Sequence, residues 1–210
     1  MKNIAIFVSG GGSNFKAIFK NITQGNILAK ICLVVSNNPN CSAIDFAKKK
    51  LLPTLIINKF RYQEAQYLES LLMDKLKPLN LDLICLAGYL KKIPNSIVTY
   101  YKNKIINIHP SLLPEFGGKG FYGMKVHNAV IKSKKKITGA TVHFVDEKYD
   151  NGPIIIQESI IVDNNDDVTS LAKKVLKIEH SIYVEAVKAF CEGRILWKNN
   201  KPLIEVEIEN

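Results

Sequence analysis

The chain has 210 residues, 47% of them hydrophobic, which is enough to bury a full core without disulfides or a structural metal. This composition is ordinary for a globular protein and too hydrophobic for a disordered one. The net charge of +10 comes mostly from dispersed lysines, with short runs at residues 48–50 and 134–136 that contain no aromatic side chains. Such dispersed charge is more typical of a solvated surface than of a nucleic-acid interface.

The lengths of the apolar runs and the spacing of the cysteines exclude further classes of protein. No apolar run reaches the roughly 18 residues of a membrane span, and the N-terminal apolar run is too short for a signal peptide. The four cysteines form no C-x-x-C pair, so they predict reduced thiols rather than a zinc or redox motif. We therefore expect a cytoplasmic protein that binds neither a membrane nor nucleic acid. The sequence fits a monomer and a homodimer equally well.

The first half of the chain alternates apolar runs with segments of helical spacing. The apolar runs predict strands at residues 3–8, 31–35, 54–57, 81–87 and 104–108. The helical spacing predicts helices at residues 14–24, 42–50 and 61–76. Continuous apolar strands separated by helices are typical of a parallel sheet that is covered on both faces.

The second half has a different pattern. A short helix at 125–133 precedes two extended segments, 138–145 and 153–162, whose charged connecting loop predicts an antiparallel pair. A long amphipathic helix follows at 168–191, with Gly193 placed as a C-cap, and the last predicted elements form a hairpin at 194–206. The sequence therefore predicts an α/β fold: a Rossmann-like, mixed and mainly parallel sheet with helices on both faces, and antiparallel strands in the C-terminal half, in a single domain spanning 1–210.

A glycine-rich loop lies between the first predicted strand and the first helix. Gly12 is the last of three glycines and is followed by Ser13 and Asn14. Glycines let the backbone approach a ligand closely, and the N–H groups of the helix N-terminus favour an anion. The loop lacks the spacing of a dinucleotide fingerprint or a P-loop, so it suits a monophosphate better. The alternative is a plain turn in which Ser13 or Asn14 caps the helix.

Two further segments carry groups suited to acid–base chemistry. Asn107 and His109 alternate along an extended segment, so they project from one face at a strand's end, where Pro110 stops the strand. An amide and an imidazole can together stabilise a developing oxyanion. Asp150, in the loop between the two late strands, offers a carboxylate that can support the charged form of His109. The alternative for Asp150 is an ordinary turn aspartate in Asp-Asn-Gly.

Together these segments resemble phosphoribosylglycinamide formyltransferases, a family of the formyltransferase superfamily. The resemblance rests on segments in the family's order over nearly the whole chain: Ser13-Asn14, Leu86 to Leu90, Asn107 to Pro114, Gly139 to Val145, Asp150 to Gln157, and Glu179-His180. The string Asn-Ile-His-Pro-Ser-Leu-Leu-Pro is the most specific of them. The resemblance implies transfer of a formyl group from 10-formyltetrahydrofolate, the co-substrate, to the amine of glycinamide ribonucleotide, without a metal.

The resemblance also implies roles for particular residues. Asn107, His109 and Asp150 would be catalytic, with a protonated His109 and Asn107 stabilising the oxyanion. The other implied roles are phosphate binding by Gly12, Ser13 and Asn14, contact with the glycinamide end by Glu179, and support of the catalytic groups by Thr141 and His143. Residues 1–105 would form the phosphate-binding half, and residues 106–210 the catalytic and folate-binding half.

The folate pocket implied by the resemblance draws on several segments. Its residues would be Leu90, Lys91, Lys92, Ile93, Asn107, Asp146 and Gln63. Part of this binding would use backbone groups of residues 90–93, so Lys91 keeps its role although arginine is common there. Some members carry an arginine near position 63 for the glutamate tail, where this chain has Gln63 with Arg61 close by.

Three other functions fit some of these features. A methionyl-tRNA formyltransferase shares the Asn-x-His core but needs a further RNA-binding domain of about a hundred residues. A formyltetrahydrofolate hydrolase uses the same three catalytic groups with water as the nucleophile. A non-catalytic nucleotide-binding module explains the glycine loop but not the three acid–base groups on separate segments.

Overall fold

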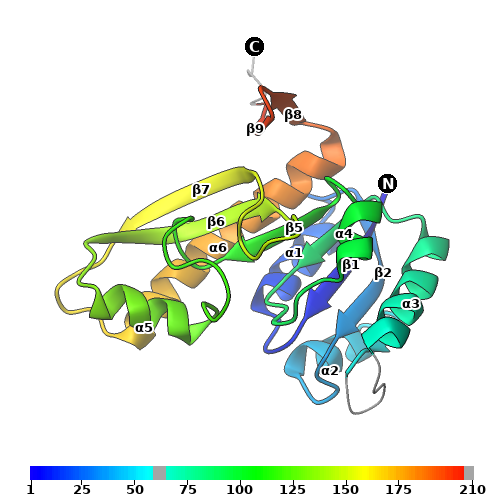
Figure 1. Ribbon diagram of the computed structural model, residues 1–210, viewed down its shortest axis with the longest axis horizontal. Coiled ribbons are helices and arrows are strands. Elements are labelled where there is room, and N and C mark those ends of the chain that lie inside the picture. Colours follow the sequence, from blue (N-terminus) through cyan, green and yellow to red (C-terminus); the bar gives the residue numbers. More distant parts are fainter. Residues whose placement is uncertain (59–64, 206–210) are drawn as a thin grey trace. The chain divides into compact units, whose positions relative to one another are not determined.

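The computed structural model describes residues 1–58 and 65–205, and the chain forms two compact units, Met1–Ile106 and Asn107–Asn210. The strands of the first unit are β1 (Lys2–Val8), β2 (Ala29–Ser36), β3 (Thr54–Ile56), β4 (Leu83–Leu86) and the start of β5 (Ile105–His109). Its helices are α1 (Ser13–Thr23), α2 (Ser42–Lys49), α3 (Ala65–Leu76), the short 3₁₀ helix η1 (Lys77–Leu79) and α4 (Asn95–Tyr100). Figure 1 labels α1 to α4.

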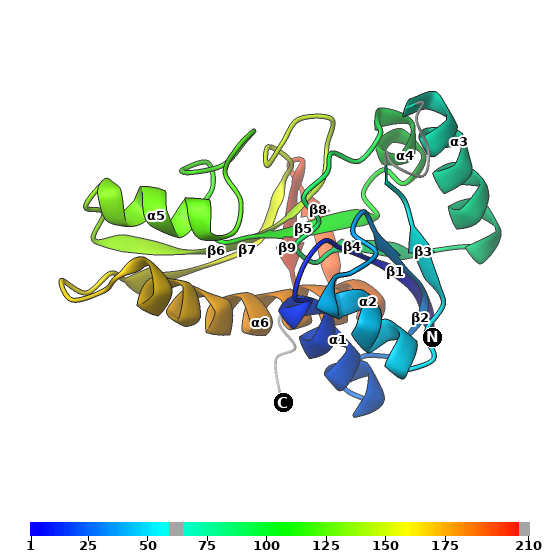
Figure 2. The ribbon, with the colours of Figure 1, turned by 90° about the horizontal axis from the view of Figure 1, so that it is seen from below.

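The sheet of the first unit has the strand order β3-β2-β1-β4, with β5 beside β4. The pairs among β1 to β4 are parallel. Helices α1 and α2 lie on one face of this sheet and α3 and α4 on the other, as Figure 2 shows. Because both faces are covered, β1 and β4 have no polar face, and Ile6, Phe7 and Ile84 are fully buried. The parallel, doubly covered sheet predicted for the first half is confirmed.

Two elements of the first unit were not predicted. Helix α4 has only six residues, too few for a helical period to show, and it begins directly after Pro94. The turn η1 likewise has three residues. The predicted helix at 61–76 is confirmed over Ala65–Leu76, and its first four residues lie outside the described part of the chain.

In the second unit β5 is followed in the sheet by β6 (Ile137–Phe144) and then β7 (Ile154–Ile161). Strands β6 and β7 are antiparallel, as predicted, with a register shift at Val142/His143. The other elements are α5 (Met124–Lys132), α6 (Val168–Glu192), β8 (Ile195–Lys198) and β9 (Lys201–Ile204). The pair β8–β9 forms the predicted C-terminal hairpin as a separate antiparallel sheet.

Helix α6 organises the second unit. It packs on β6 and β7 and contacts α5. Its ends are fixed by local chemistry: Asp167 and Ser170 form a capping box, and Gly193 closes the helix with φ of 75°. No helix in the described ranges, 1–58 and 65–205, is both long and apolar enough to cross a membrane.

Candidate active site

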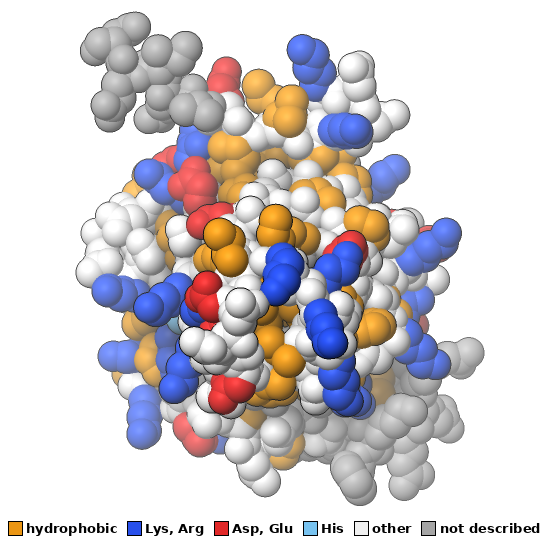
Figure 3. Space-filling view, turned by 90° about the vertical axis from the view of Figure 1, so that its left-hand side faces the viewer, with side chains coloured by type: hydrophobic (Ala, Val, Ile, Leu, Met, Phe, Trp, Pro, Cys, Tyr) orange, Lys and Arg blue, Asp and Glu red, His pale blue; other side chains and the backbone are white. Residues whose placement is uncertain are grey.

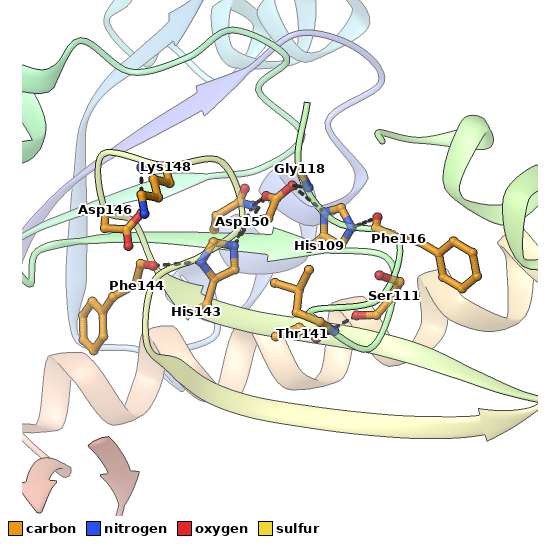
Figure 4. Close-up of polar contacts among 12 residues, drawn as sticks. His109, Ser111, Phe116, Gly118, Thr141, His143, Phe144, Asp146, Lys148 and Asp150 are labelled. Atoms are coloured by element: carbon orange, nitrogen blue, oxygen red, sulfur yellow. Dashed lines mark hydrogen bonds and ion pairs between the residues drawn. The ribbon is translucent and has the colours of Figure 1, made fainter. Parts of the chain in front are cut away.

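Three side chains of the second unit converge at the end of β5. Asn107 and His109 are two residues apart on this strand, and Asp150 comes from the connection between β6 and β7. Figure 4 shows His109 and Asp150 side by side. The Asn107 Nδ2 atom lies 3.4 Å from Asp150 Oδ1, and the His109 Nδ1 atom lies 3.6 Å from Asp150 Oδ2. The His109 and Asp150 side chains are only 4% and 12% exposed. The structure therefore brings together the three groups that the sequence predicts as catalytic.

The backbone around Asp150 aims its carboxylate at β5. Asp150 has a left-handed φ of 51°, which aspartate tolerates better than most residues. Gly152 passes so close to β6 that an added Cβ would lie 1.9 Å from the Phe144 carbonyl oxygen, so only glycine fits there. The Gly118 N–H donates to Asp150 Oδ2 at 2.9 Å and fixes the orientation of the carboxylate.

The His109 ring is held by a backbone carbonyl. Its Nε2 atom lies 2.8 Å from the Phe116 carbonyl oxygen, which can only accept, so Nε2 carries the proton and Nδ1 faces Asp150. Burial lowers the pKa of His109. The negative charge of Asp150 and the hydrogen bond to the Phe116 carbonyl raise it by less, so the pKa stays below its ordinary value. At neutral pH the ring is therefore neutral, with an unprotonated Nδ1 beside a carboxylate. The protonated His109 expected at the oxyanion stage would therefore form during the reaction rather than at rest.

His143 fixes the amide of Asn107. Its Nδ1 donates to the carbonyl oxygen of Phe144 at 2.8 Å, so in the neutral ring Nε2 accepts from Asn107 Nδ2 at 3.1 Å. Burial lowers the pKa of His143, which keeps this neutral form at pH 7. The Asn107 amide nitrogen is thereby turned toward Asp150, where its second hydrogen makes only the long 3.4 Å contact.

Thr141 holds the turn that follows β5. Its hydroxyl donates to the Ser111 carbonyl oxygen at 2.6 Å and accepts from the Leu113 N–H at 3.1 Å. The Gln157 amide adds a bond to the same hydroxyl at 2.9 Å and one to the Leu113 carbonyl at 2.8 Å. Thr141 is fully buried, so these bonds fix the chain that carries Phe116 toward His109.

The glycine loop belongs to the first unit. Gly12 has φ of 69°, and an added Cβ would lie 2.6 Å from the Cβ of Ala43. Gly10 and Gly11 have open space where a side chain would stand. Ser13 begins α1, and no side chain caps the helix, so its first N–H groups can meet an anion. Asn14 is 6% exposed, on the buried side of the same turn.

The predicted folate residues are divided between the units. In the first unit, Leu90, Lys91 and Lys92 are exposed and Ile93 is buried, whereas Gln63 lies outside the described residues. In the second unit, Asp146 accepts from the backbone of Lys148 and the side chain of Asn151, both at 2.8 Å, and so holds its own loop. Glu179, expected at the glycinamide end, is 9% exposed on α6.

Sequence reasoning gave no role to Phe116 and Gly118. Both act through backbone groups, the carbonyl on His109 and the N–H on Asp150. A backbone contact leaves no residue-type signal, and the only clue is the glycine-rich composition of residues 117–123. Among the described residues, no group of three or more histidine, cysteine or acidic side chains is arranged to hold a metal ion.

Comparison with known proteins places this site in a family. The sequence profile described as formyl transferase matches residues 2–187. The chain belongs to the formyl transferase family. The resemblance expected from the sequence is thus confirmed, and the mixed, mainly parallel sheet is the fold of this family.

Individual relatives of this formyl transferase agree over nearly its full length. It is 44% identical to "phosphoribosylglycinamide formyltransferase, chloroplastic" of Arabidopsis thaliana, over 97% of this chain and 70% of the plant protein. It is 35% identical to phosphoribosylglycinamide formyltransferase of Bacillus subtilis, over 96% of this chain and 98% of that protein. The crystal structure of glycinamide ribonucleotide transformylase 1 from Symbiobacterium toebii matches with a TM-score of 0.90 and 32% identity, over 98% of this chain and 95% of that one.

Proposed function

We propose that this formyl transferase moves the formyl group of 10-formyltetrahydrofolate to the amine of glycinamide ribonucleotide. The observation that carries the proposal is the convergence of Asn107, His109 and Asp150 on one point of a buried site. The names of the related proteins support the choice of acceptor, since the bacterial relative is matched over 98% of its length. A role in purine synthesis, which the family resemblance implies, is part of the proposal.

In the proposed mechanism, the acceptor amine attacks the formyl carbon, and the carbonyl oxygen becomes an oxyanion. Asn107 donates to that oxygen with the amide hydrogen that now makes only the 3.4 Å contact with Asp150. His143 keeps the amide in this orientation because its Nε2 accepts the other hydrogen. Thr141 supports the site by fixing the turn after His109.

Proton transfer would run through Asp150 and His109. Asp150 accepts the proton that the amine nitrogen loses on forming the new C–N bond. The proton then reaches the unprotonated Nδ1 of His109, whose imidazolium stabilises the oxyanion and protonates the leaving nitrogen of tetrahydrofolate. The neutral resting state of His109, caused by its burial, makes it a proton acceptor at this stage.

Substrate binding would draw on residues from several segments of the chain. The uncapped start of α1, with Gly12, Ser13 and Asn14, suits the acceptor phosphate, and Glu179 the glycinamide end. The folate ring would bind along Leu90 to Ile93, with Asp146, Asn107 and Gln63 as its further contacts. We also propose that residues 1–105 bind the phosphate and supply residues 90–93 and Gln63 to the folate. Residues 106–210 would carry the catalytic groups and the remaining folate contacts.

The proposed partners are small molecules. On the face shown in Figure 3, lysine and arginine side chains stand among hydrophobic, acidic and other side chains rather than in one continuous band. This supports a solvated basic surface over a nucleic-acid interface. The absence of membrane binding, the cytoplasmic location, and the choice between monomer and homodimer stay predictions.

The test is an acceptor requirement. The purified chain is mixed with 10-formyltetrahydrofolate, with and without glycinamide ribonucleotide, and the folate product is followed by absorbance. Turnover that depends on the ribonucleotide is the expected result. Equal turnover without it would mean that water is the acceptor and that the protein is a hydrolase. No turnover by folded protein would contradict the proposal.

A further inference from the structure

Ser9 occupies a junction in the first unit that the proposed mechanism leaves unexplained. It follows β1 directly, precedes the three glycines of the loop, and is 7% exposed. Its hydroxyl accepts a hydrogen bond from the Leu90 N–H at 2.8 Å and donates to the side-chain oxygen of Asn37. One small side chain therefore connects three loops, which follow β1, β2 and β4.

The backbone of Ser9 makes the same connections. Its N–H donates to the Gly88 carbonyl oxygen at 3.1 Å, and its carbonyl accepts from Asn38 Nδ2 at 3.4 Å. Each polar atom of Ser9 thus binds the loop after β4 or the loop after β2. In an open α/β sheet, ligands bind at this end of the strands.

The segment that Ser9 holds has few other attachments. The Tyr89 ring packs edge-on against Phe7 with ring centroids 5.3 Å apart, and Leu90 itself is 50% exposed. Over the described ranges, the backbone N–H groups of Lys91 and Lys92 donate no hydrogen bond to the protein. These free groups suit ligand binding, but their positions depend on how Leu90 is fixed.

We propose that Ser9 is a positioning residue for folate binding. Its hydroxyl fixes the backbone of Leu90, and so sets where the free N–H groups of Lys91 and Lys92 meet the pterin ring. This inference rests on the proposed function, because it assigns the folate to residues 90–93. The Leu90 N–H itself is already bound to Ser9, which leaves the N–H groups of Lys91 and Lys92 as the proposed donors.

The expected consequence is a binding defect rather than a rate defect. Ser9→Ala leaves the Leu90 N–H without its partner, and the loss of such a bond is worth about tenfold in an equilibrium constant. We expect the Kd for tetrahydrofolate, and the KM for the formyl folate, to rise about tenfold. We expect kcat to stay close to the wild-type value, since the groups proposed for the chemistry are unchanged.

Ser36 provides a matched control in the same unit. It is fully buried at the end of β2, and its hydroxyl bonds to both the N–H and the carbonyl of Asn38 at 3.0 Å. Ser36→Ala therefore removes a buried, hydrogen-bonded hydroxyl without touching Leu90. A second variant, Asn37→Ala, removes the group that orients the Ser9 hydroxyl and should weaken folate binding in the same direction by a smaller factor.

The experiment is titration calorimetry with tetrahydrofolate, followed by kcat and KM measurements on each folded variant. We expect the Kd to rise for Ser9→Ala and Asn37→Ala and to stay unchanged for Ser36→Ala. Ser9→Thr keeps the hydroxyl and should therefore retain most of the wild-type affinity. An unchanged Kd in Ser9→Ala, or an equal rise in Ser36→Ala, would overturn the positioning role alone. Failure of the wild-type chain to bind tetrahydrofolate would instead overturn the proposed function.

Discussion

His127 should make the protein markedly less stable in mild acid. It lies on α5, is 4% exposed, and its Nδ1 atom has no hydrogen-bond partner among the described residues. Burial lowers its pKa to about 4, and repulsion from a charged His109 contributes to the same shift. Its pKa in the unfolded chain is the ordinary 6.5. Between these values the unfolded state binds more protons, so stability is complete above about pH 6.5 and falls as the pH drops toward 4.

The size of the effect follows from the shift. Each pKa unit corresponds to about 1.4 kcal/mol, and between about pH 7.5 and about pH 5 the titration of His127 removes about 2 kcal/mol of unfolding free energy. His127→Gln abolishes this titration. Urea unfolding gives the free energy of unfolding at each of the two pH values. Its decrease from the higher to the lower pH should be about 2 kcal/mol smaller in His127→Gln than in the wild type.

The control for this comparison is Asn128→Gln, an exposed change next to His127 on the same helix. It should keep the wild-type pH dependence. The pKa values of His109, His143 and His180 are also lowered, each chiefly by burial, so part of the acid destabilisation should remain in His127→Gln. Identical pH dependence in His127→Gln and the wild type would refute the reasoning.

Three further substitutions test the geometry of the sites. Gly12→Ala places a Cβ 2.6 Å from the Cβ of Ala43, at a position where the backbone has a left-handed φ. The KM for glycinamide ribonucleotide should therefore rise at least tenfold. The Kd for tetrahydrofolate, measured by calorimetry, should stay unchanged. Gly152→Ala forces a Cβ against a carbonyl oxygen and should cost about 1–3 kcal/mol in urea unfolding, together with most of kcat, because Asp150 moves. Thr141→Val removes three buried hydrogen bonds at nearly constant side-chain volume. It should lower the free energy of unfolding by about 2–3 kcal/mol. A decrease of less than about 0.5 kcal/mol would contradict the role of Thr141 in fixing the turn after β5.

Much of the first unit could be predicted because its central strands, β1 and β4, consist mainly of continuous apolar runs. Residues 4–8, for example, are buried on both faces of the sheet, and such an unbroken apolar run is visible in the sequence. The antiparallel pair of β6 and β7 could likewise be predicted from two extended segments and the loop between them. Helix α4 was not readable, because six residues after a proline carry no measurable period.

The site was predictable only in part. The alternation of Asn107 and His109 along a strand places them on one face by geometry alone. Nothing in the spacing says that Asp150 meets them, since it lies 43 residues beyond Asn107, and that expectation came from resemblance to a family. The Phe116 carbonyl and the Gly118 N–H, which hold the side chains of His109 and Asp150, are backbone atoms that any residue type could supply. The role of Ser9 depends on loops brought together by the sheet and was equally hidden.

The most direct measurement is kcat/KM for Asp150→Asn in the presence of both proposed substrates. The substitution keeps the shape of the side chain but removes the carboxylate that lies 3.6 Å from His109 Nδ1, and Asp163→Asn removes an equal charge from an exposed ion pair with Lys174. Proton transfer through Asp150 predicts a fall of about 10²–10⁴-fold for the first variant and none for the second. Activity of folded Asp150→Asn within a few-fold of the wild type would show that the three converging groups do not carry the reaction.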